Sequence, residues 1–168
     1  MPNRIERLAA DALGAAKDIK AGFAGLTGIF MHLMEEHGKV NALIKRVLAT
    51  SDDGVRAKLY PTIRSELLTH EKGEVNVLYA ALADFPETQA IASEHFVQAS
   101  DLEGAIAELD AISFGDAAWA GTFEGLARLV AKHVDEEESR YFPLAQKVMG
   151  EERARALQAA YEAAKRVS

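Results

Sequence analysis

Apolar residues recur every three or four positions over four long stretches of the chain, which places them on one face of an α-helix. The first stretch covers residues 27–49 and ends before the helix-breaking run Thr50-Ser51-Asp52-Asp53-Gly54. The second leads up to Asp84-Phe85-Pro86, and Pro61 marks either its beginning or a kink within it. Both stretches are therefore predicted to be long helices.

The second half of the chain repeats this organisation. A third helix is predicted to start at Pro86-Glu87, because proline suits the first turn of a helix. Residues 113–116 form a predicted turn in which Asp116 caps a fourth helix, and that helix is predicted to end near Phe142-Pro143. Four long helices with short connections predict an all-α protein with an up-down-up-down four-helix bundle.

Two further helical segments flank the predicted bundle. We divide the chain into an N-terminal helical extension (residues 1–26), the bundle (27–147) and a C-terminal helix (148–168) that follows Gly150. Both flanking segments are expected to pack on the bundle or to form a homodimer contact. For the first, the alternative is a weak membrane-surface or partner helix.

Composition excludes several classes of function. The 168 residues suffice for one domain with a single core, and the net charge of -7 disfavours a nucleic-acid partner. The absence of cysteine excludes disulfides, thiolate zinc sites and thiol nucleophiles. No apolar run is long enough to span a bilayer, and the first residues lack the pattern of a secretory signal. We therefore expect no membrane span and a cytoplasmic location.

Four of the five histidines fall one to each predicted bundle helix, in line with its apolar stripe. In two helices a glutamate follows the histidine by four positions, which keeps both side chains on the same face. His32 lies about 140° around the helix from His37 and is predicted to be a surface or interface histidine. The inward-facing set comprises His37, His70, Glu74, His95, His133 and Glu137.

These six residues form a repeat. His37 is followed after 33 positions by His70, and His95 after 38 positions by His133. Taken singly, a buried histidine is more often a core residue, and a His–Glu pair is often a surface contact. Together, however, six such side chains at one level of a small core would cost on the order of several kcal/mol per unpaired ion. Coordination removes that cost, so the pattern predicts a site for two metal ions.

The ligand types indicate which metal. Nitrogen and carboxylate donors fit iron, manganese or zinc, and a pair of shared carboxylates fits a dinuclear iron or manganese site. Structural zinc sites usually have four fixed ligands, often cysteines, and zinc has no redox chemistry. We therefore expect two iron ions, with manganese or zinc as alternatives.

The same residues resemble the hemerythrin-like, HHE cation-binding domain family over residues 27–147. The resemblance implies that Glu74 and Glu137 bridge two irons, with His37, His70, His95 and His133 as terminal ligands. It is carried by Met34-Glu35-Glu36-His37, Leu68-Thr69-His70-Glu71-Lys72-Gly73-Glu74, Ser93-Glu94-His95, His133-Val134-Asp135-Glu136-Glu137 and Tyr141-Phe142-Pro143.

The chain also departs from the oxygen-carrying members of that family. They place two histidines on the third helix, whereas Ile91 and Ala99 lie four positions from His95 here, and Glu137 replaces an aspartate. The chain is thus more similar to bacterial hemerythrin-like proteins and to di-iron proteins implicated in the repair of iron-sulfur centres. Water, oxo or hydroxo groups, or an extra carboxylate, would fill the positions left open. Glu71 is a candidate for that carboxylate, and its alternative is an exposed helix residue.

Three classes of function fit such a centre. We expect a di-iron protein that binds or senses dioxygen, nitric oxide, peroxide or related small oxidants. The alternatives are a redox enzyme (peroxide decomposition, ferroxidase action, nitric-oxide or iron-sulfur repair chemistry) and a protein for iron sensing or storage. We expect Phe30, Trp119 and Phe123 to wall a dry pocket. Tyr141 is expected to orient Glu137 or to gate the site, unless it is only a core aromatic.

Overall fold

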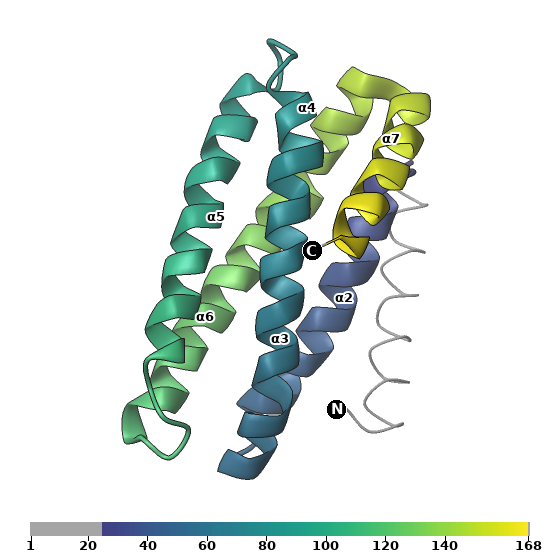
Figure 1. Cartoon of the computed structure of the whole chain (residues 1–168). Coiled ribbons are helices and arrows are strands. Elements are labelled where there is room, and N and C mark those ends of the chain that lie inside the picture. Colours follow the sequence, from purple (N-terminus) through teal and green to yellow (C-terminus); the bar gives the residue numbers. More distant parts are fainter. Residues whose placement is uncertain (1–24, 168) are drawn as a thin grey trace.

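The computed structural model describes residues 25–167 and is all helical over that range, without strands (Figure 1). The N-terminal extension, as far as residue 24, lies outside the described residues. Four long helices make up the bundle: α2 (Ile29–Leu48), α3 (Asp53–Gly73), α5 (Gln89–Asp110) and α6 (Ala117–Glu136). The predicted all-α four-helix bundle is thereby confirmed. None of the described helices is long and apolar enough to cross a membrane.

The second and fourth helices of the bundle each contain a π-helical segment. Helix α3 continues through η1 (Glu74–Tyr79) into the short α4 (Ala80–Leu82). Helix α6 continues through η2 (Glu137–Tyr141) into α7 (Phe142–Arg166). A π turn widens the helix by one residue and is frequent at functional sites. Both π segments start at a glutamate of the predicted metal site.

Helix starts differ from the sequence prediction at two places. Helix α3 begins at Asp53, where the carboxylate of Asp52 accepts hydrogen bonds from the backbone N–H of Gly54 and Val55, so Pro61 lies inside the helix. Helix α5 begins at Gln89 and not at the predicted Pro86. Just before it, the buried Thr88 hydroxyl donates a hydrogen bond of 2.6 Å to the carbonyl of Leu82. The predicted cap at Asp116 is present and accepts from Ala118 N–H.

The predicted end of the fourth helix at Phe142-Pro143 is wrong. Proline removes one backbone donor, but Pro143 lies in the first turn of α7, directly after η2, where the regular hydrogen-bond ladder is already interrupted. The helix breaks instead at Gly150, whose φ of 78° lies in the left-handed region that favours glycine. The part of α7 beyond Gly150 then turns back and lies beside α2 and α3 (Figure 1).

The core consists of two apolar clusters with a polar layer between them. The first, here called the proximal cluster, lies next to α7 and includes Phe30, Leu33, Met34, Leu78, Tyr79, Tyr141, Phe142 and Tyr161. The second, here called the distal cluster, includes Leu59, Ile63, Leu67, Leu102, Trp119, Phe123, Leu126 and Val130. On α2, His37 lies between Met34 of the proximal cluster and Val40 of the distal cluster. On each of the other three helices the buried histidine also lies between residues of the two clusters, so the four histidines share one level of the bundle.

The turned-back part of α7 docks through two close approaches. Gly28 has a φ of 57°, and a Cβ built there would lie 2.4 Å from the carbonyl carbon of Ala154. A Cβ on Gly73 would lie 2.5 Å from the ring of Tyr161. Larger residues at either position would push α7 away from the bundle.

Gly28→Ala is expected to lower the free energy of unfolding by about 2 kcal/mol or more, because it adds a clash to an unfavourable φ. Denaturant titration followed by circular dichroism measures the change. Gly104→Ala is the control, since Gly104 is an exposed helical residue with open space around its Cβ position. That control should gain up to about 1 kcal/mol from helix propensity. Equal stability of Gly28→Ala and the unchanged protein would contradict the close docking.

Candidate metal centre

The structure brings all six predicted site residues together in the polar layer. They come from the four bundle helices and the two π segments that continue them: His37 from α2, His70 from α3, His95 from α5 and His133 from α6, with the two glutamates at the starts of η1 and η2. All six are buried, and Glu74, His95 and Glu137 have no exposed surface. Six polar side chains therefore share one level of the core.

The Nε2 atoms of the histidines converge on the two glutamates. His37 Nε2 lies 3.1 Å from His70 Nε2 and 3.3 Å from Glu137 Oε2. His70 Nε2 and His95 Nε2 each lie 3.3 Å from Glu74 Oε2. His133 Nε2 lies 3.4 Å from Glu137 Oε2. One nitrogen of each imidazole is thus aimed at a common centre.

Seven buried residues fall into two groups of four that could each hold a metal ion, with one residue shared. Within each group, one ligand atom per residue lies within 4.8 Å of all the others, and Glu74 belongs to both groups. Glu137 belongs to the first group and also approaches His95 and His133 of the second, at 3.4 Å each. The groups are His37, His70, Glu74 and Glu137, and Glu71, Glu74, His95 and His133.

Glu71 is part of the second group and is not an exposed helix residue. Its side chain is 2% exposed, and its Oε1 lies 3.1 Å from His133 Nε2. Its other oxygen lies 3.7 Å from His95 Nε2. The second group therefore holds a carboxylate that has no counterpart in the first, in line with the candidate role that the sequence indicated.

Each π segment ends in a buried tyrosine, and Tyr79 of η1 contacts the candidate ligands. The Tyr79 hydroxyl donates a hydrogen bond of 2.5 Å to Glu137 Oε1, and its ring stacks on His95 with centroids 3.5 Å apart. The predicted contact between Tyr141 and Glu137 is not formed. The Tyr141 hydroxyl accepts from Gln98 Nε2 at 3.2 Å instead. Tyr79, from the opposite half of the bundle, orients Glu137.

The Nδ1 atoms of the histidines face different partners. His37 Nδ1 lies 3.1 Å from Glu138 Oε1, and His70 Nδ1 lies 2.9 Å from Glu36 Oε2. His133 Nδ1 lies 2.9 Å from the amide oxygen of Gln98. His95 Nδ1 is buried without a hydrogen-bond partner among the described residues. Such outer contacts fix the ring orientation and increase the donor strength of an imidazole toward a metal.

The buried charges shift each other's pKa values strongly. Burial alone would lower the pKa of His95, but contacts with Glu137 and Glu74 outweigh it and raise that pKa to about 9. Burial is likewise outweighed at His133, where Glu137 and Glu71 raise the pKa to about 12. Burial and the neighbouring Glu74 carboxylate would raise the pKa of Glu137, yet the surrounding histidines lower it to about 2. Cationic imidazoles and anionic carboxylates thus stabilise each other here.

The donor set fits a pair of hard or borderline cations. One oxygen each of Glu71, Glu74 and Glu137 is buried without a hydrogen-bond partner among the described residues. Unpaired buried carboxylate oxygens are costly, and metal coordination is the ordinary way to satisfy them. Imidazole nitrogens and carboxylate oxygens suit iron, manganese or zinc. The geometry and the donors are therefore those of a metal site.

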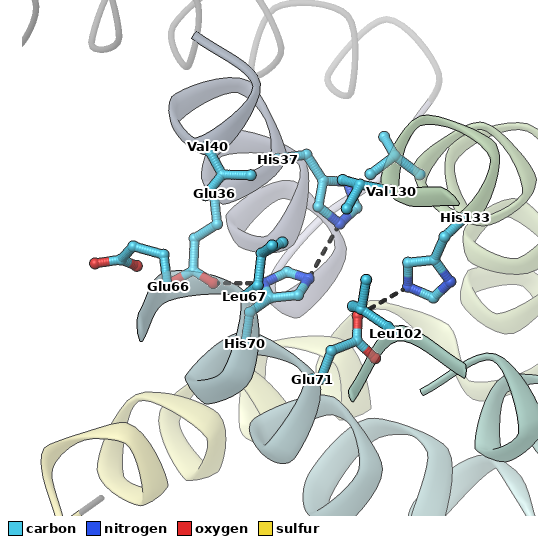
Figure 2. Close-up of a pocket in the computed structure, with 11 residues that line it drawn as sticks. Glu36, His37, Val40, Glu66, Leu67, His70, Glu71, Leu102, Val130 and His133 are labelled. Atoms are coloured by element: carbon cyan, nitrogen blue, oxygen red, sulfur yellow. Dashed lines mark hydrogen bonds and ion pairs between the residues drawn. The ribbon is translucent and has the colours of Figure 1, made fainter. Parts of the chain in front are cut away.

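A small cavity opens beside the polar layer on the distal side (Figure 2). It has a volume of about 20 Å³, enough for one water-sized molecule. Its polar lining includes His37, His70, Glu71 and His133, and its apolar walls are Val40, Leu67, Leu102 and Val130. The side chains that face one another across this space are drawn in Figure 2. The cavity gives a small ligand a place next to both groups of ligands.

The aromatic residues expected to wall this pocket lie elsewhere. Phe30 belongs to the proximal cluster on the opposite side of the polar layer, where its ring packs against Phe142. Trp119 and Phe123 stack on each other in the distal cluster and line a separate hollow with Arg56. Branched aliphatic residues, and not aromatic rings, form the walls of the cavity.

His32 and the C-terminal helix meet at the edge of the site. As predicted, His32 is an interface histidine, with a side chain 24% exposed and a ring centroid 5.6 Å from that of Tyr161. The sequence analysis missed the roles of Tyr161 and Lys165, which both reach Glu36 from α7. Spacing along the sequence could not reveal these contacts, since they depend on how α7 folds back.

Comparison with known proteins identifies the family of the chain. The model of the hemerythrin HHE cation-binding domain matches residues 29–145, which span α2 to the first turn of α7. No curated protein and no solved structure matches the chain. The family match and the two buried ligand groups agree in supporting metal binding. The chain belongs to the hemerythrin HHE cation-binding domain family.

Proposed function

We propose that the protein is a non-haem di-iron protein that binds or senses dioxygen, nitric oxide or a related small oxidant. His37 and His70 would hold one iron, and His95 and His133 the other. Glu74 and Glu137 would bridge the two. The observation that carries this proposal is the small, mostly apolar cavity beside three of the four histidines. A pocket of that size admits a diatomic molecule and excludes larger substrates.

The choice of iron rests on the donor set. Four imidazoles and shared carboxylates, in a chain without cysteine, suit a redox-active dinuclear centre better than a structural zinc site. A di-iron centre supplies electrons and open positions for a small oxidant when it is bound. Manganese and zinc are the alternatives that metal analysis would detect.

The surrounding residues have separable roles in this proposal. Tyr79 donates its proton toward Glu137 Oε1 and thereby holds one bridging carboxylate in place. The rings of Tyr79 and Phe142, which stack against His95 and His37, close the proximal side of the centre. Aliphatic side chains line part of the distal side of the centre, where the cavity lies. A small ligand would therefore approach from the distal side.

Glu71 favours a second candidate function, iron sensing or storage. Its buried carboxylate lies where it would occupy a coordination position of the iron held by His95 and His133. A filled position leaves less room for an exogenous ligand, and metal occupancy would then stabilise the fold itself. The subtype of bacterial di-iron repair proteins, and redox catalysis such as peroxide decomposition, remain further alternatives within the same centre.

The protein purified from iron-replete cells without added metal is expected to contain two irons per chain. Glu74→Gln should reduce this to near zero, because Glu74 belongs to both ligand groups. Inductively coupled plasma mass spectrometry gives the count. Glu103→Gln, on the exposed face of α5, is the matched control and should keep both irons. Two zinc ions, or full iron content in Glu74→Gln, would refute the proposed centre.

Val130→Leu should slow binding of nitric oxide or dioxygen by on the order of tenfold, because the added methylene enters the cavity. Stopped-flow absorbance of the reduced, iron-loaded protein measures the rate. Iron content should be unchanged. Val97→Leu, at a residue 62% exposed, is the control. A visible band that disappears on degassing supports reversible binding, whereas irreversible change with peroxide consumption favours the redox-enzyme alternative.

The metal-free protein is expected to lose stability between about pH 6.5 and pH 9. The folded state raises the pKa of His95 to about 9, so it binds a proton that the unfolded chain releases near 6.5. The contribution of His95 is complete below pH 6.5 and disappears as the pH rises through 9, which amounts to roughly 3 kcal/mol. His133, whose pKa is raised to about 12, adds to the decline over the same range. Urea unfolding at the two pH values measures it.

Two controls accompany this pH measurement. The iron-loaded protein should lack the decline, because its imidazoles bind metal in place of protons. His95→Asn should lessen the decline in the metal-free protein by roughly 3 kcal/mol, whereas His32→Asn, at the interface with α7, should leave it unchanged. A metal-free protein that is more stable at pH 9 than at pH 6.5 would show that the proposed ion pairs do not form.

A further inference from the structure

The part of α7 beyond Gly150 lies outside the segment that matches the family, yet it reaches the candidate metal centre. The family match covers residues 29–145, whereas this part of the helix runs from residue 151 to Arg166. It is tightly docked: Ala154 and Tyr161 have no exposed surface, and Gly28 and Gly73 leave no space for a Cβ beneath it. This helix is therefore a fixed part of the fold.

Tyr161 is the residue of α7 that approaches the centre most directly. Its hydroxyl donates a hydrogen bond of 2.6 Å to Glu36 Oε2 and lies 3.3 Å from His70 Nδ1. The same Glu36 oxygen lies 2.9 Å from His70 Nδ1. The tyrosine hydroxyl and the imidazole N–H thus share one acceptor, and the ring of Tyr161 fits into the space left by Gly73.

The second oxygen of Glu36 is held from the same helix. Lys165 Nζ donates to Glu36 Oε1 at 2.7 Å, and His32 Nε2 lies 3.3 Å from that oxygen. Each carboxylate oxygen therefore has two partners, and the two closest partners besides His70 come from α7. A carboxylate fixed in this way holds the imidazole ring in one orientation and increases its basicity.

The other half of the centre has a neutral counterpart that does not involve α7: Gln98 stands behind His133 and donates from Nε2 to Glu136 Oε2 at 2.6 Å and to the Tyr141 hydroxyl at 3.2 Å. His133 Nδ1 faces the neutral amide oxygen of Gln98, and His95 Nδ1 has no hydrogen-bond partner among the described residues. The two ligand groups are alike in histidines and bridging glutamates but differ in what stands behind them. An effect that originates in α7 should consequently appear at one metal position only.

We propose that Tyr161 and Lys165 are positioning residues for the metal centre, which act by holding Glu36 against His70 and so selectively stabilise the metal at the His37/His70 position. This inference rests on the proposed function in one respect, namely that the two ligand groups bind metal. It assigns to the C-terminal helix a role at the centre, beyond packing on the bundle.

The test is release of Fe(II) from the anaerobically iron-loaded full-length protein to the chromogenic chelator ferrozine. Loss of an outer hydrogen-bond partner typically weakens metal binding about 10- to 100-fold. Glu36→Gln is expected to accelerate release of one of the two irons within that range. Tyr161→Phe should accelerate release of the same iron, by on the order of tenfold, at the lower end of that range. The second iron should keep its wild-type rate in both variants.

Tyr60→Phe is the matched control. Tyr60 belongs to the distal cluster, and its hydroxyl donates a hydrogen bond of 2.9 Å to the carboxylate of Asp110, so this variant also removes a tyrosine–carboxylate hydrogen bond. Mössbauer spectra of protein loaded with the iron-57 isotope provide a second readout. One quadrupole doublet should change in Tyr161→Phe and none in Tyr60→Phe. A general loss of stability would instead affect both irons, and in both variants.

Three outcomes separate the two proposals. Failure of the unchanged protein to bind two irons would overturn the proposed function itself. Two irons with identical release in Tyr161→Phe and Tyr60→Phe would overturn the positioning role and leave the di-iron centre intact. Faster release of both irons in Tyr161→Phe would also overturn it, because the effect would then be structural and not selective for one position.

Discussion

The structure depends on how a layer of charged side chains is accommodated in the middle of an apolar bundle. Four imidazoles and three carboxylates lie between two hydrophobic clusters, with exposures of 7% or less. Isolated charges there would cost several kcal/mol each, on the order of the whole stability of a small domain. Histidines and glutamates reduce this cost by pairing with each other, and a metal pair would coordinate the buried carboxylate oxygens that accept no hydrogen bond among the described residues. The surrounding fold keeps these groups in place.

The π segments are the local solution to this constraint. A regular α-helix places residues four apart on one face, which suffices for His70 with Glu74 and for His133 with Glu137. The widened turn at η1 brings Tyr79, five residues after Glu74, under the ligands, where it stacks on His95 and reaches Glu137. Each half of the bundle thereby supplies a buried glutamate at the centre, and one half also supplies the hydroxyl that orients the carboxylate of the other.

Helical spacing was enough to predict the ligand layer, because periodicity fixes which face of a helix a residue occupies. The rise of 1.5 Å per residue also shows why Trp119 cannot line a pocket next to His133. The two residues are 14 positions apart, or about 21 Å along the helix. The π segments and the helix that continues through Pro143 had no comparable signal, since each depends on tertiary contacts that override local preference. The contact of Tyr161 could not be predicted for the same reason. Gly73 lies within the motif Leu68–Glu74, but its position in the sequence does not indicate which aromatic ring packs against it.

The near-symmetry of the ligands makes the asymmetry of their surroundings informative. Carboxylates stand behind His37 and His70, whereas a neutral amide stands behind His133. Conversely, Glu71 adds its charge directly to the group of His95 and His133. Negative charge is thus distributed differently: two carboxylates stand behind the imidazoles in one half, and one lies among the candidate ligands in the other. Two ions held by these groups would share their bridges yet differ in how many positions remain open. Under the proposed function, such inequivalence would suit a centre in which one ion stabilises the fold while the other binds the small ligand.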